Sequence, residues 1–429
     1  MRVLMFGWEF PPHISGGLGT ASHGLTKGMA AIDNLEVLFV VPKAWGDEDQ
    51  TIVHIIGANK VPVAYKKISF KGEKRFIDKI EVDVKIVPYT DPDDFWNKVR
   101  NEVETRRLLF QTNSQGTVDF SGRYDQNLME EIYKYSVVAS VIAAENDFDI
   151  IHAHDWLAYP AGIAAKEVSG KPLVIHVHAT DFDRSGGSVN PEVYKIEKEG
   201  MDAASKIITV SNLTRDIVIN KYHIDPAKVV TVYNAVEPLD VKPPEVKKGF
   251  DEKVVTFLGR ITMQKGPEYF IEAAYKVLQK CDNVRFVMAG SGDMMERMIR
   301  RAAALKITDR FHFTGFLKGD DVTKMLSMSD VYIMPSVSEP FGISPLEAMR
   351  SNVPTIISKQ SGVAEILTYA IKTDFWDVDA MADAIYGILN YPSLAHMFIK
   401  NGKREVVSLQ WEKSAKEVKK IYDQVLGNC

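Results

Sequence analysis

The chain has 429 residues, of which 45% are hydrophobic and 25% are charged, and its formal net charge is −5 at pH 7. This length predicts two large domains, and the composition is that of an ordinary globular protein, which excludes the disordered and fibrous classes. A slightly acidic balance without a long lysine or arginine run argues against a nucleic acid or an anionic membrane surface as partner.

Cysteine usage and the first residues bear on the compartment. Cys281 and Cys429 are too few for a disulfide framework or a cysteine metal site, which indicates a reducing environment. The chain enters a buried-strand pattern at once, with no secretory leader pattern and no apolar run long enough to cross a membrane. We therefore expect a cytoplasmic protein. No pattern in the sequence predicts an oligomeric state.

The first half of the chain alternates short apolar runs with helical patterns. The runs cover 3–6, 37–41, 150–153, 173–177 and 207–210, which predicts a parallel sheet. Between the first two runs, apolar residues share one helical face, as in a helix that covers a sheet: Leu18, Ala21, Leu25, Met29 and Ile32. A first domain is predicted over 1–236. The stretch 95–125 fits neither the strand pattern nor the helical pattern and is interpreted as an excursion or a lid.

A second alternating series follows the segment 237–253, which is rich in proline and lysine and is interpreted as a linker between domains. Apolar runs at 254–258, 284–288, 311–313, 331–334 and 354–357 predict a second doubly wound domain over 254–410. The fold class is thus α/β, with two Rossmann-like lobes. Because ligands of such sheets bind outside the carboxyl ends of the strands, we expect the active site in the cleft between the lobes.

A glycine cluster, Gly16-Gly17-Leu18-Gly19, lies between the first strand and the first helix. Glycines let a ligand approach the backbone closely, and a helix N-terminus presents unpaired N–H groups to a phosphate. The cluster fits a phosphate-binding loop. It fits a tight strand-to-helix turn equally well, because its spacing is not that of the dinucleotide-binding fingerprint.

Two carboxylates, Glu339 and Glu347, flank a predicted strand-to-helix turn in EPFGISPLE. Ser344 followed by Pro345 is typical of a capped helix start, which places Glu339 in the loop and Glu347 in the first helical turn. Glu347 has an alternative role, because Ser-x-x-Glu is also the pattern of a capping box.

Two cations follow the first strand of the second domain. Arg260 directly follows Gly259, and Lys265 comes five residues later. Fixed cations at a strand end can clamp a leaving diphosphate and do what a metal ion does elsewhere. The alternative is solvated surface charge.

Two His-x-His pairs occupy predicted strands of the first domain, His152 with His154 and His176 with His178. Side chains two apart share a strand face, so each pair could chelate a metal, as in metal-dependent hydrolases. The other interpretation, hydrogen-bonded histidines at the end of a sheet, is favoured.

Taken in chain order, four segments resemble the retaining GT-B glycosyltransferases, and in particular the bacterial and archaeal glycogen and starch synthases: FGWEFPPHISGGLGTAS, HAHDW, LGRITMQKG and EPFGISPLEAM. The resemblance implies metal-independent transfer, without another cofactor, of a hexosyl unit, first of all glucose, from ADP-glucose or UDP-glucose to an α-glucan or another glycan. It also implies that the last helical stretch, 411–426, crosses back to the first domain.

The resemblance assigns a role to each motif residue. Arg260 and Lys265 would hold the donor diphosphate, Glu347 the ribose hydroxyls, and Glu339 the transferred sugar near its reacting carbon without a covalent role. Further donor contacts would come from both lobes once the cleft closes: Gly16, Gly17, Gly342, Ile343 and Ser344. His178 would contact the sugar as a catalytic-site residue, and Asp155 and Trp156 would lie on the acceptor side.

The phosphate loop departs from the family pattern, with His13-Ile14-Ser15 where glycogen synthases often carry a lysine. Other functions remain open. A GT-A enzyme would use an Asp-x-Asp metal motif, found by letters at 147–149 and 181–183. The further alternatives are a GT-B enzyme of cell-surface polysaccharide or lipid-linked glycan synthesis and a non-enzymatic two-lobed sugar-binding protein. Three tryptophans are candidates for stacking on sugar rings: Trp8, Trp45 and Trp156.

Overall fold

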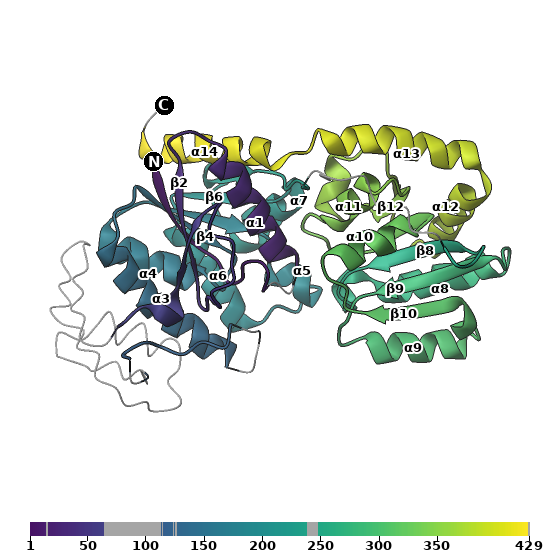
Figure 1. The fold of residues 1–429 in the computed structure, drawn as a ribbon, viewed down its shortest axis with the longest axis horizontal. Helices are drawn as coiled ribbons and strands as arrows, with labels where there is room; N and C mark the ends of the chain where they lie inside the picture. The colour runs from purple at the N-terminus through teal and green to yellow at the C-terminus, as the bar shows by residue number, and fades with distance from the viewer. Residues whose placement is uncertain are drawn as a thin grey trace.

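The computed structural model describes residues 1–13, 16–63, 113, 115–122, 124, 127–237 and 248–427. These residues form two lobes that lie side by side (Figure 1). Most of the predicted excursion at 95–125 and most of the predicted linker at 237–253 lie outside the described residues. Among the described helices, none has the length and apolar character needed to cross a membrane.

The first lobe is built on a seven-stranded sheet of order β3-β2-β1-β4-β5-β6-β7, in which all neighbours are parallel. Its strands are β1 Arg2–Phe6, β2 Glu36–Val41, β3 His54–Gly57, β4 Ile150–His154, β5 Leu173–Val177, β6 Lys206–Thr209 and β7 Val229–Thr231. Its helices are α1 Gly17–Ala30, α3 Leu128–Glu145, α4 Tyr159–Ser169, α5 Asp181–Ser185, α6 Pro191–Ala203 and α7 Asn212–Tyr222. The short edge strands β3 and β7 were not predicted.

The second lobe has a six-stranded parallel sheet of order β10-β9-β8-β11-β12-β13. Its strands are β8 Lys253–Leu258, β9 Val284–Ala289, β10 Phe311–Gly315, β11 Val331–Met334, β12 Thr355–Ser358 and β13 Ile371–Thr373. Its helices are α8 Pro267–Leu278, α9 Met295–Ala304, α10 Asp320–Ser327, α11 Ser344–Arg350, α12 Val378–Asn390 and α13 Pro392–Val407. The α/β class with two doubly wound lobes is confirmed.

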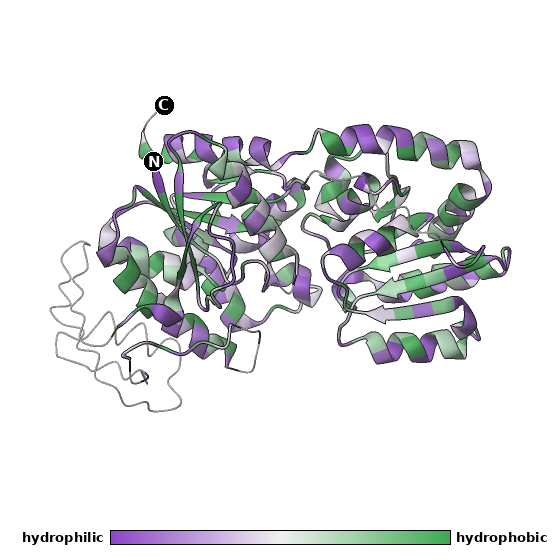
Figure 2. Ribbon diagram, viewed as in Figure 1, coloured by the Kyte–Doolittle hydropathy of each residue, from purple (hydrophilic) through white to green (hydrophobic). Residues whose placement is uncertain are grey.

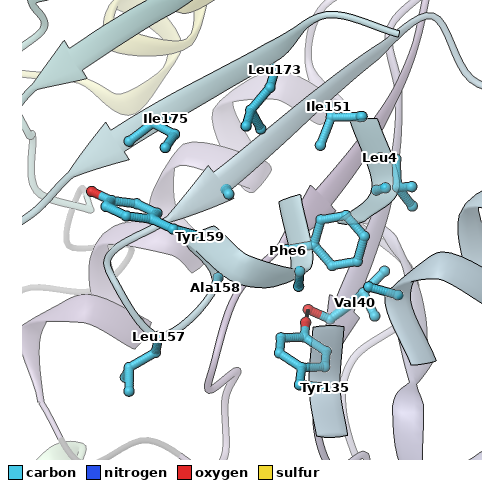
Figure 3. Packing of buried hydrophobic residues seen from close by; sticks show 14 of the residues in the cluster. Leu4, Phe6, Val40, Tyr135, Ile151, Leu157, Ala158, Tyr159, Leu173 and Ile175 are labelled. Atoms are coloured by element: carbon cyan, nitrogen blue, oxygen red, sulfur yellow. Dashed lines mark hydrogen bonds between the residues drawn. The ribbon is translucent and has the colours of Figure 1, made fainter. Parts of the chain in front are cut away.

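Each sheet is buried on both faces, which explains why its strands are continuous apolar runs (Figure 2). Along β1, Leu4 and Phe6 belong to one core cluster and Val3 and Met5 to the cluster on the opposite face. Figure 3 shows Leu4 and Phe6 packed close to Tyr135 of α3. The buried Tyr135 hydroxyl donates to the Val40 carbonyl oxygen at 2.8 Å, which ties α3 to the sheet.

The C-terminal helix α14, Trp411–Leu426, has the predicted bounds and packs on α1 of the first lobe, whereas α13 lies on the second lobe (Figure 1). Two glycines of α1 make this contact possible. A Cβ on Gly24 would lie 2.2 Å from Trp411 Cε2, and one on Gly28 would lie 2.5 Å from the Trp411 carbonyl oxygen. The chain therefore crosses twice between the lobes, and Trp411 anchors the return.

The strand orders define where ligands bind. The direction of winding reverses between β1 and β4 in the first sheet and between β8 and β11 in the second. Crevices outside the carboxyl ends of strands at such switch points are the ligand sites of open α/β sheets. The loops that follow these four strands carry most of the predicted site residues.

Candidate active site

Loops after β8 and β11 bring the predicted donor-side charges together. Lys265 ends the 3-10 turn η3, Met263–Lys265, and Glu339 lies in the loop after β11. Because β8 and β11 are neighbours in the sheet, these loops meet, and the Lys265 ammonium forms an ion pair with the Glu339 carboxylate. Residues 74 positions apart in the chain thus share one site.

Hydrogen bonds hold Glu339 in place from three sides. Its side chain is only 8% exposed and accepts a hydrogen bond from the Ser336 hydroxyl at 3.1 Å. Its backbone N–H donates to the Gln360 carbonyl oxygen, and its own carbonyl oxygen accepts from Gly362 N–H, both at 2.9 Å. The carboxylate is therefore a fixed group beside a cation. Such preorganisation is what stabilises charge that develops during a reaction.

Arg260 behaves differently from Lys265. It is exposed, and within the described part of the chain its guanidinium has no hydrogen-bond or ion-pair partner. An unpaired guanidinium two residues beyond a switch-point strand is suited to a ligand with two or more anionic oxygens, because its five N–H groups form a planar fork.

Gly266 makes the close approach of the two loops possible. Its φ is 64°, and a Cβ there would lie 2.1 Å from the Pro335 carbonyl oxygen. Any other residue would push η3 away from the end of β11. Gly342, with a φ of 99°, makes the turn that leads into α11. These glycines place Lys265 next to Glu339 and α11 next to both.

The predicted helix cap at Ser344 is wrong. The structure has Ile343 at the N-cap position of α11 and Ser344 inside the first turn, with no side-chain cap. The Ser344 hydroxyl instead accepts a hydrogen bond from the Tyr332 hydroxyl at 2.8 Å. A tertiary contact from β11 has taken the group that would cap the helix, so the capping-box interpretation of Glu347 is also wrong.

Glu347 is left with a half-buried carboxylate that has no hydrogen bond from the described residues. Burial raises its pKa above the ordinary value, and the positive charge of Arg350 opposes that shift. A buried polar group without a protein partner costs free energy unless a ligand or water satisfies it. Glu347 is therefore suited to hold ligand hydroxyls.

Gly16 and Gly17 lie where the sequence predicts, at the N-cap and the first residue of α1. A Cβ on either glycine would meet no described atom within 4 Å, so the space in front of this backbone is open. Glu9, a buried carboxylate that follows β1, was not among the predicted site residues. Its Oε1 accepts from the Gly19 N–H at 3.1 Å, so part of the positive end of α1 is already compensated.

Asp155 follows β4 in the left-handed region, with a φ of 61°. Its Oδ2 accepts from Arg184 at 2.7 Å, and its Oδ1 accepts from the backbone N–H of His178 at 3.2 Å and of Ala179 at 3.3 Å. Asp155 therefore organises the loops after β4 and β5. Arg184, which the sequence analysis did not identify, also pairs with the buried Glu197 at 3.1 Å.

The tryptophan candidates differ in environment. Trp8 is buried against Tyr135, and the half-buried Trp156 packs on the same core cluster, so neither offers an open ring face. Trp45 is 45% exposed and stacks on the His13 ring at 4.8 Å. Of the three, Trp45 alone has a largely exposed side chain.

The four histidines form a stack on the α14 side of the first sheet. His154 lies opposite His176 in the register of β4 and β5, and the Tyr422 hydroxyl of α14 bonds to His152 Nδ1. Neighbouring centroids lie between 4.3 Å, for His176 and His178, and 5.3 Å, for His152 and His176. Burial lowers the pKa of all four rings, that of His178 to about 4.

The favoured interpretation, hydrogen-bonded histidines, is confirmed for three of the four rings, and the geometry argues against chelation. The ring nitrogens of His152, His154 and His176 lie within 4.8 Å of one another. Their rings are nearly parallel, however, so the nitrogen lone pairs run side by side instead of converging on one point as tetrahedral ligation requires. Nor are all of them hydrogen-bonded, because both ring nitrogens of His176 are buried without a partner among the described residues.

The Asp-x-Asp motifs are structural. Asp149 precedes β4, at the end of the sheet opposite the site, and accepts from the Arg2 N–H at 2.7 Å. Asp181 begins α5 and accepts from the Asn190 N–H at 2.6 Å, while Asp183 accepts from Thr180 and Ser338. These carboxylates hold loops together instead of facing a common metal position.

Side chains and backbone groups join the two lobes beside the site. The Ser338 hydroxyl, next to Glu339, donates to Asp183 Oδ1 in α5 at 2.6 Å. The Glu365 carboxylate accepts from the first backbone N–H groups of α7, those of Asn212 at 2.9 Å and Leu213 at 2.7 Å. These contacts leave no local pattern in the sequence, because each joins residues more than 150 positions apart.

Comparisons with known proteins bear on this site. Residues 241–405 match the family described as Glycosyl transferases group 1, and residues 119–238 match Glycosyltransferase Family 4. An uncharacterized glycosyltransferase of Methanocaldococcus jannaschii is 27% identical, over 98% of each chain. A 2-deoxystreptamine N-acetyl-D-glucosaminyltransferase of Niallia circulans is also 27% identical, over 72% of this chain and 82% of its own. A glycogen synthase of Mycobacterium tuberculosis is 22% identical, over 98% and 94%.

Solved structures with the same arrangement of lobes cover nearly the whole chain. Sucrose-phosphate synthase of Thermosynechococcus elongatus has a TM-score of 0.71 at 17% identity, with 100% of each chain covered. The catalytic domain of starch synthase IV of Arabidopsis thaliana, bound to ADP and acarbose, has a TM-score of 0.66 at 16% identity, with 99% of each covered. HepE of Anabaena, in complex with UDP-glucose, has a TM-score of 0.65 at 14% identity, with 99% and 100% covered.

Two doubly wound lobes with charged loops at facing switch points have the GT-B fold, and each lobe matches a glycosyltransferase family model. These matches support a glycosyltransferase that is similar to the group 1 family over residues 241–405. The glycogen synthase is less similar than the other two relatives, so the comparisons do not single out glycogen synthesis.

Proposed function

We propose that this chain transfers a hexosyl unit, glucose as the first candidate, from a nucleoside diphosphate sugar to a glycan with retention of anomeric configuration. The observation that carries the proposal is the Lys265–Glu339 pair, with an exposed Arg260, which has no described partner, in the same loop after β8. Breaking the donor bond leaves negative charge on the diphosphate and positive charge on the sugar. A site that places cations next to a fixed carboxylate is complementary to that separation.

The proposed roles follow from what each group can do. Arg260 and Lys265 carry the countercharge of the leaving diphosphate, so the reaction needs no metal ion or other cofactor. Glu347, whose carboxylate has no described hydrogen-bond partner, accepts from the ribose hydroxyls. Glu339 lies against the transferred sugar and forms no covalent bond. Gly342 and Ile343 contribute backbone at the start of α11, and Ser344 lies in its first turn.

The first lobe supplies the other wall. Gly16 and Gly17 leave open space in front of α1 for the donor phosphates, and His178 contacts the sugar from the end of β5. On the acceptor side Asp155 acts by ordering the loops after β4 and β5. Trp45 is more exposed than Trp156 and is the better candidate for a glycan contact, although His13 and Lys43 already lie against its ring.

An α-glucan is the proposed acceptor. Support comes from the match to a glycogen synthase over 94% of that protein and from the fold shared with a starch synthase bound to ADP and acarbose. The donor is ADP-glucose or UDP-glucose, since solved structures of the same fold are bound to ADP and to UDP-glucose.

A matrix of nucleotide sugars against acceptors tests the proposal. ADP-, UDP- and GDP-hexoses are combined with glycogen, maltooligosaccharides and lipid-linked acceptors, with and without exhaustive chelation, and product linkage is determined. Incorporation into an α-linked glucan that survives chelation is the expected result. Transfer only to lipid-linked acceptors would replace the glucan assignment by cell-surface glycan synthesis. Binding of free sugar without nucleotide affinity would point to a non-enzymatic protein.

A further inference from the structure

The ring of His178 is held by a second histidine. His154 Nδ1 and His178 Nε2 lie 2.8 Å apart, within hydrogen-bond distance. His154 is the last residue of β4 and fully buried, whereas His178 directly follows β5 and is half-buried. The backbone N–H of His178 donates to Asp155 Oδ1 at 3.2 Å, so both its ring and its backbone are fixed.

The hydrogen bond between the two rings has a direction. Burial lowers the pKa of both imidazoles, so at neutral pH each ring carries one proton, and one nitrogen donates while the other accepts. The remaining nitrogen of His154, Nε2, is buried without a partner. Either it is a bare acceptor, with the proton on Nδ1, or it is a buried N–H without an acceptor.

The first of these two states is favoured. Buried N–H groups without an acceptor are rarer in proteins than buried acceptors without a donor. His154 then donates from Nδ1 to His178 Nε2, and the proton of His178 lies on its own Nδ1. His152, His154 and His176 each have at least one ring nitrogen that is buried without a hydrogen-bond partner. His178 Nδ1 is not such a nitrogen. Nδ1–H is therefore the group that His178 presents outside the stack.

We propose that His154 is a positioning residue that keeps His178 in the Nδ1–H tautomer, so that His178 offers a hydrogen-bond donor to an oxygen of the transferred sugar. The site of action is the first-lobe wall, since His178 lies three residues before α5, which contacts the 3-10 turn η3 of the second lobe. This inference rests on the proposed function, in which His178 contacts the donor sugar.

Three variants separate positioning from bulk packing. His154→Leu removes the donor, and His154→Asn keeps an amide N–H near the place of Nδ1. His152→Asn is the matched control, because His152 stacks on His154 at 4.4 Å but bonds to Tyr422 instead of His178. Nitrogen NMR of isotopically labelled histidines, assigned with His178→Gln, reports the tautomer without any substrate. Steady-state kinetics report turnover.

In the unmodified chain we expect His178 to carry its proton on Nδ1. In His154→Leu we expect the His178 ring to populate both tautomers. His154→Leu should lose about tenfold in kcat, the scale of one hydrogen bond, with little change in the KM of the donor. His154→Asn should recover most of this loss, and His152→Asn should stay near the unmodified rate.

A proton on Nε2 of His178 in the unmodified chain would overturn the inference, as would equal losses in His154→Asn, His154→Leu and the His152 control. If His154→Leu does not fold, judged by its thermal transition, the tautomer of the unmodified chain and the His154→Asn rate decide. If the proposed function itself is wrong, no nucleotide sugar is consumed. That result does not depend on which tautomer of His178 the NMR spectrum reports.

Discussion

The Ser338 hydroxyl donates to Asp183 Oδ1 at 2.6 Å. This hydrogen bond joins the two lobes, and Ser338 is the residue directly before Glu339. Burial raises the pKa of Asp183, and the bonds from Ser338 and Thr180 oppose that shift. The two lobes are thus tied together at the site itself, so their relative orientation and the position of Glu339 are coupled.

Ser338→Ala should therefore lower kcat/KM by roughly tenfold, the scale of one lost hydrogen bond to a buried acceptor, with little effect on the stability of either lobe. Small-angle scattering should show a larger radius of gyration. Ser327→Ala is the matched control, because the Ser327 hydroxyl bonds only to the Thr323 carbonyl within α10. Unchanged turnover in Ser338→Ala would mean that the contact does not hold a productive arrangement.

Lys265→Ala and Arg260→Ala should each fold normally and lose roughly 100-fold in rate, the usual scale for removing one contact to charge that develops in the transition state. Steady-state rates with the identified donor measure this. Lys276→Ala and Arg297→Ala serve as controls, because both side chains form exposed ion pairs on helices α8 and α9. Near-full turnover in either site variant would defeat the diphosphate assignment.

Glu347→Gln should weaken donor binding by about tenfold or more, because the variant loses charge-assisted hydrogen bonds to the ribose. The stability of the fold should not fall, since the carboxylate caps nothing and burial already disfavours its charge. Titration with nucleoside diphosphate and a thermal melt measure the two effects. Glu412→Gln, an exposed glutamate in the first turn of α14, is the control. Lower stability with unchanged nucleotide affinity would argue against a ligand role.

Gly24→Ala should destabilise the protein by about 1–3 kcal/mol, because the added Cβ would overlap the Trp411 ring where α14 crosses α1. Gly387→Ala is the matched control in α12. Its Cβ would meet Leu394 at an ordinary 3.8 Å, so this change should stabilise by about 0.5–1 kcal/mol. Denaturant unfolding measures both. Equal effects of the two changes would show that the crossing tolerates a looser contact.

Acid should destabilise the fold through the histidine stack. The folded pKa of each ring lies below the unfolded value of 6.5, and that of His178 is about 4. The unfolded chain therefore binds more protons at low pH. The stabilisation is complete above about pH 6.5 and falls as the pH drops towards 4, by about 1.4 kcal/mol per pH unit for each histidine.

Denaturant unfolding at a series of pH values checks this slope. His176→Leu should reduce this slope by the contribution of one histidine, since the His176 ring has no described hydrogen bond to lose. His396→Asn, at an exposed position of α13, should leave the slope unchanged. An unchanged slope between pH 4.5 and 6.5 in His176→Leu would contradict the buried, neutral state of the stack.

By itself the sequence determined the elements and their order. Strands such as Leu173–Val177 and Val331–Met334 have the predicted bounds, as does helix Trp411–Leu426, because burial on both faces or on one face leaves an apolar pattern within a few consecutive residues. The edge strand β7, Val229–Thr231, was missed because it is short and only partly buried. The donor-side motif residues were also found, since Arg260, Lys265 and Glu339 lie in loops after predicted strands.

Only the tertiary structure decided which polar side chains bond to one another and which stay available to a ligand. Ser344 was predicted to cap its own helix, but Tyr332 from β11 bonds to its hydroxyl and leaves Glu347 without a described hydrogen bond. Lys265 meets Glu339 because two sheet neighbours end at one edge, and Asp183 meets Ser338 because the lobes face each other. Local patterns record burial and helix periodicity, whereas these bonds depend on how segments distant in the chain are packed together.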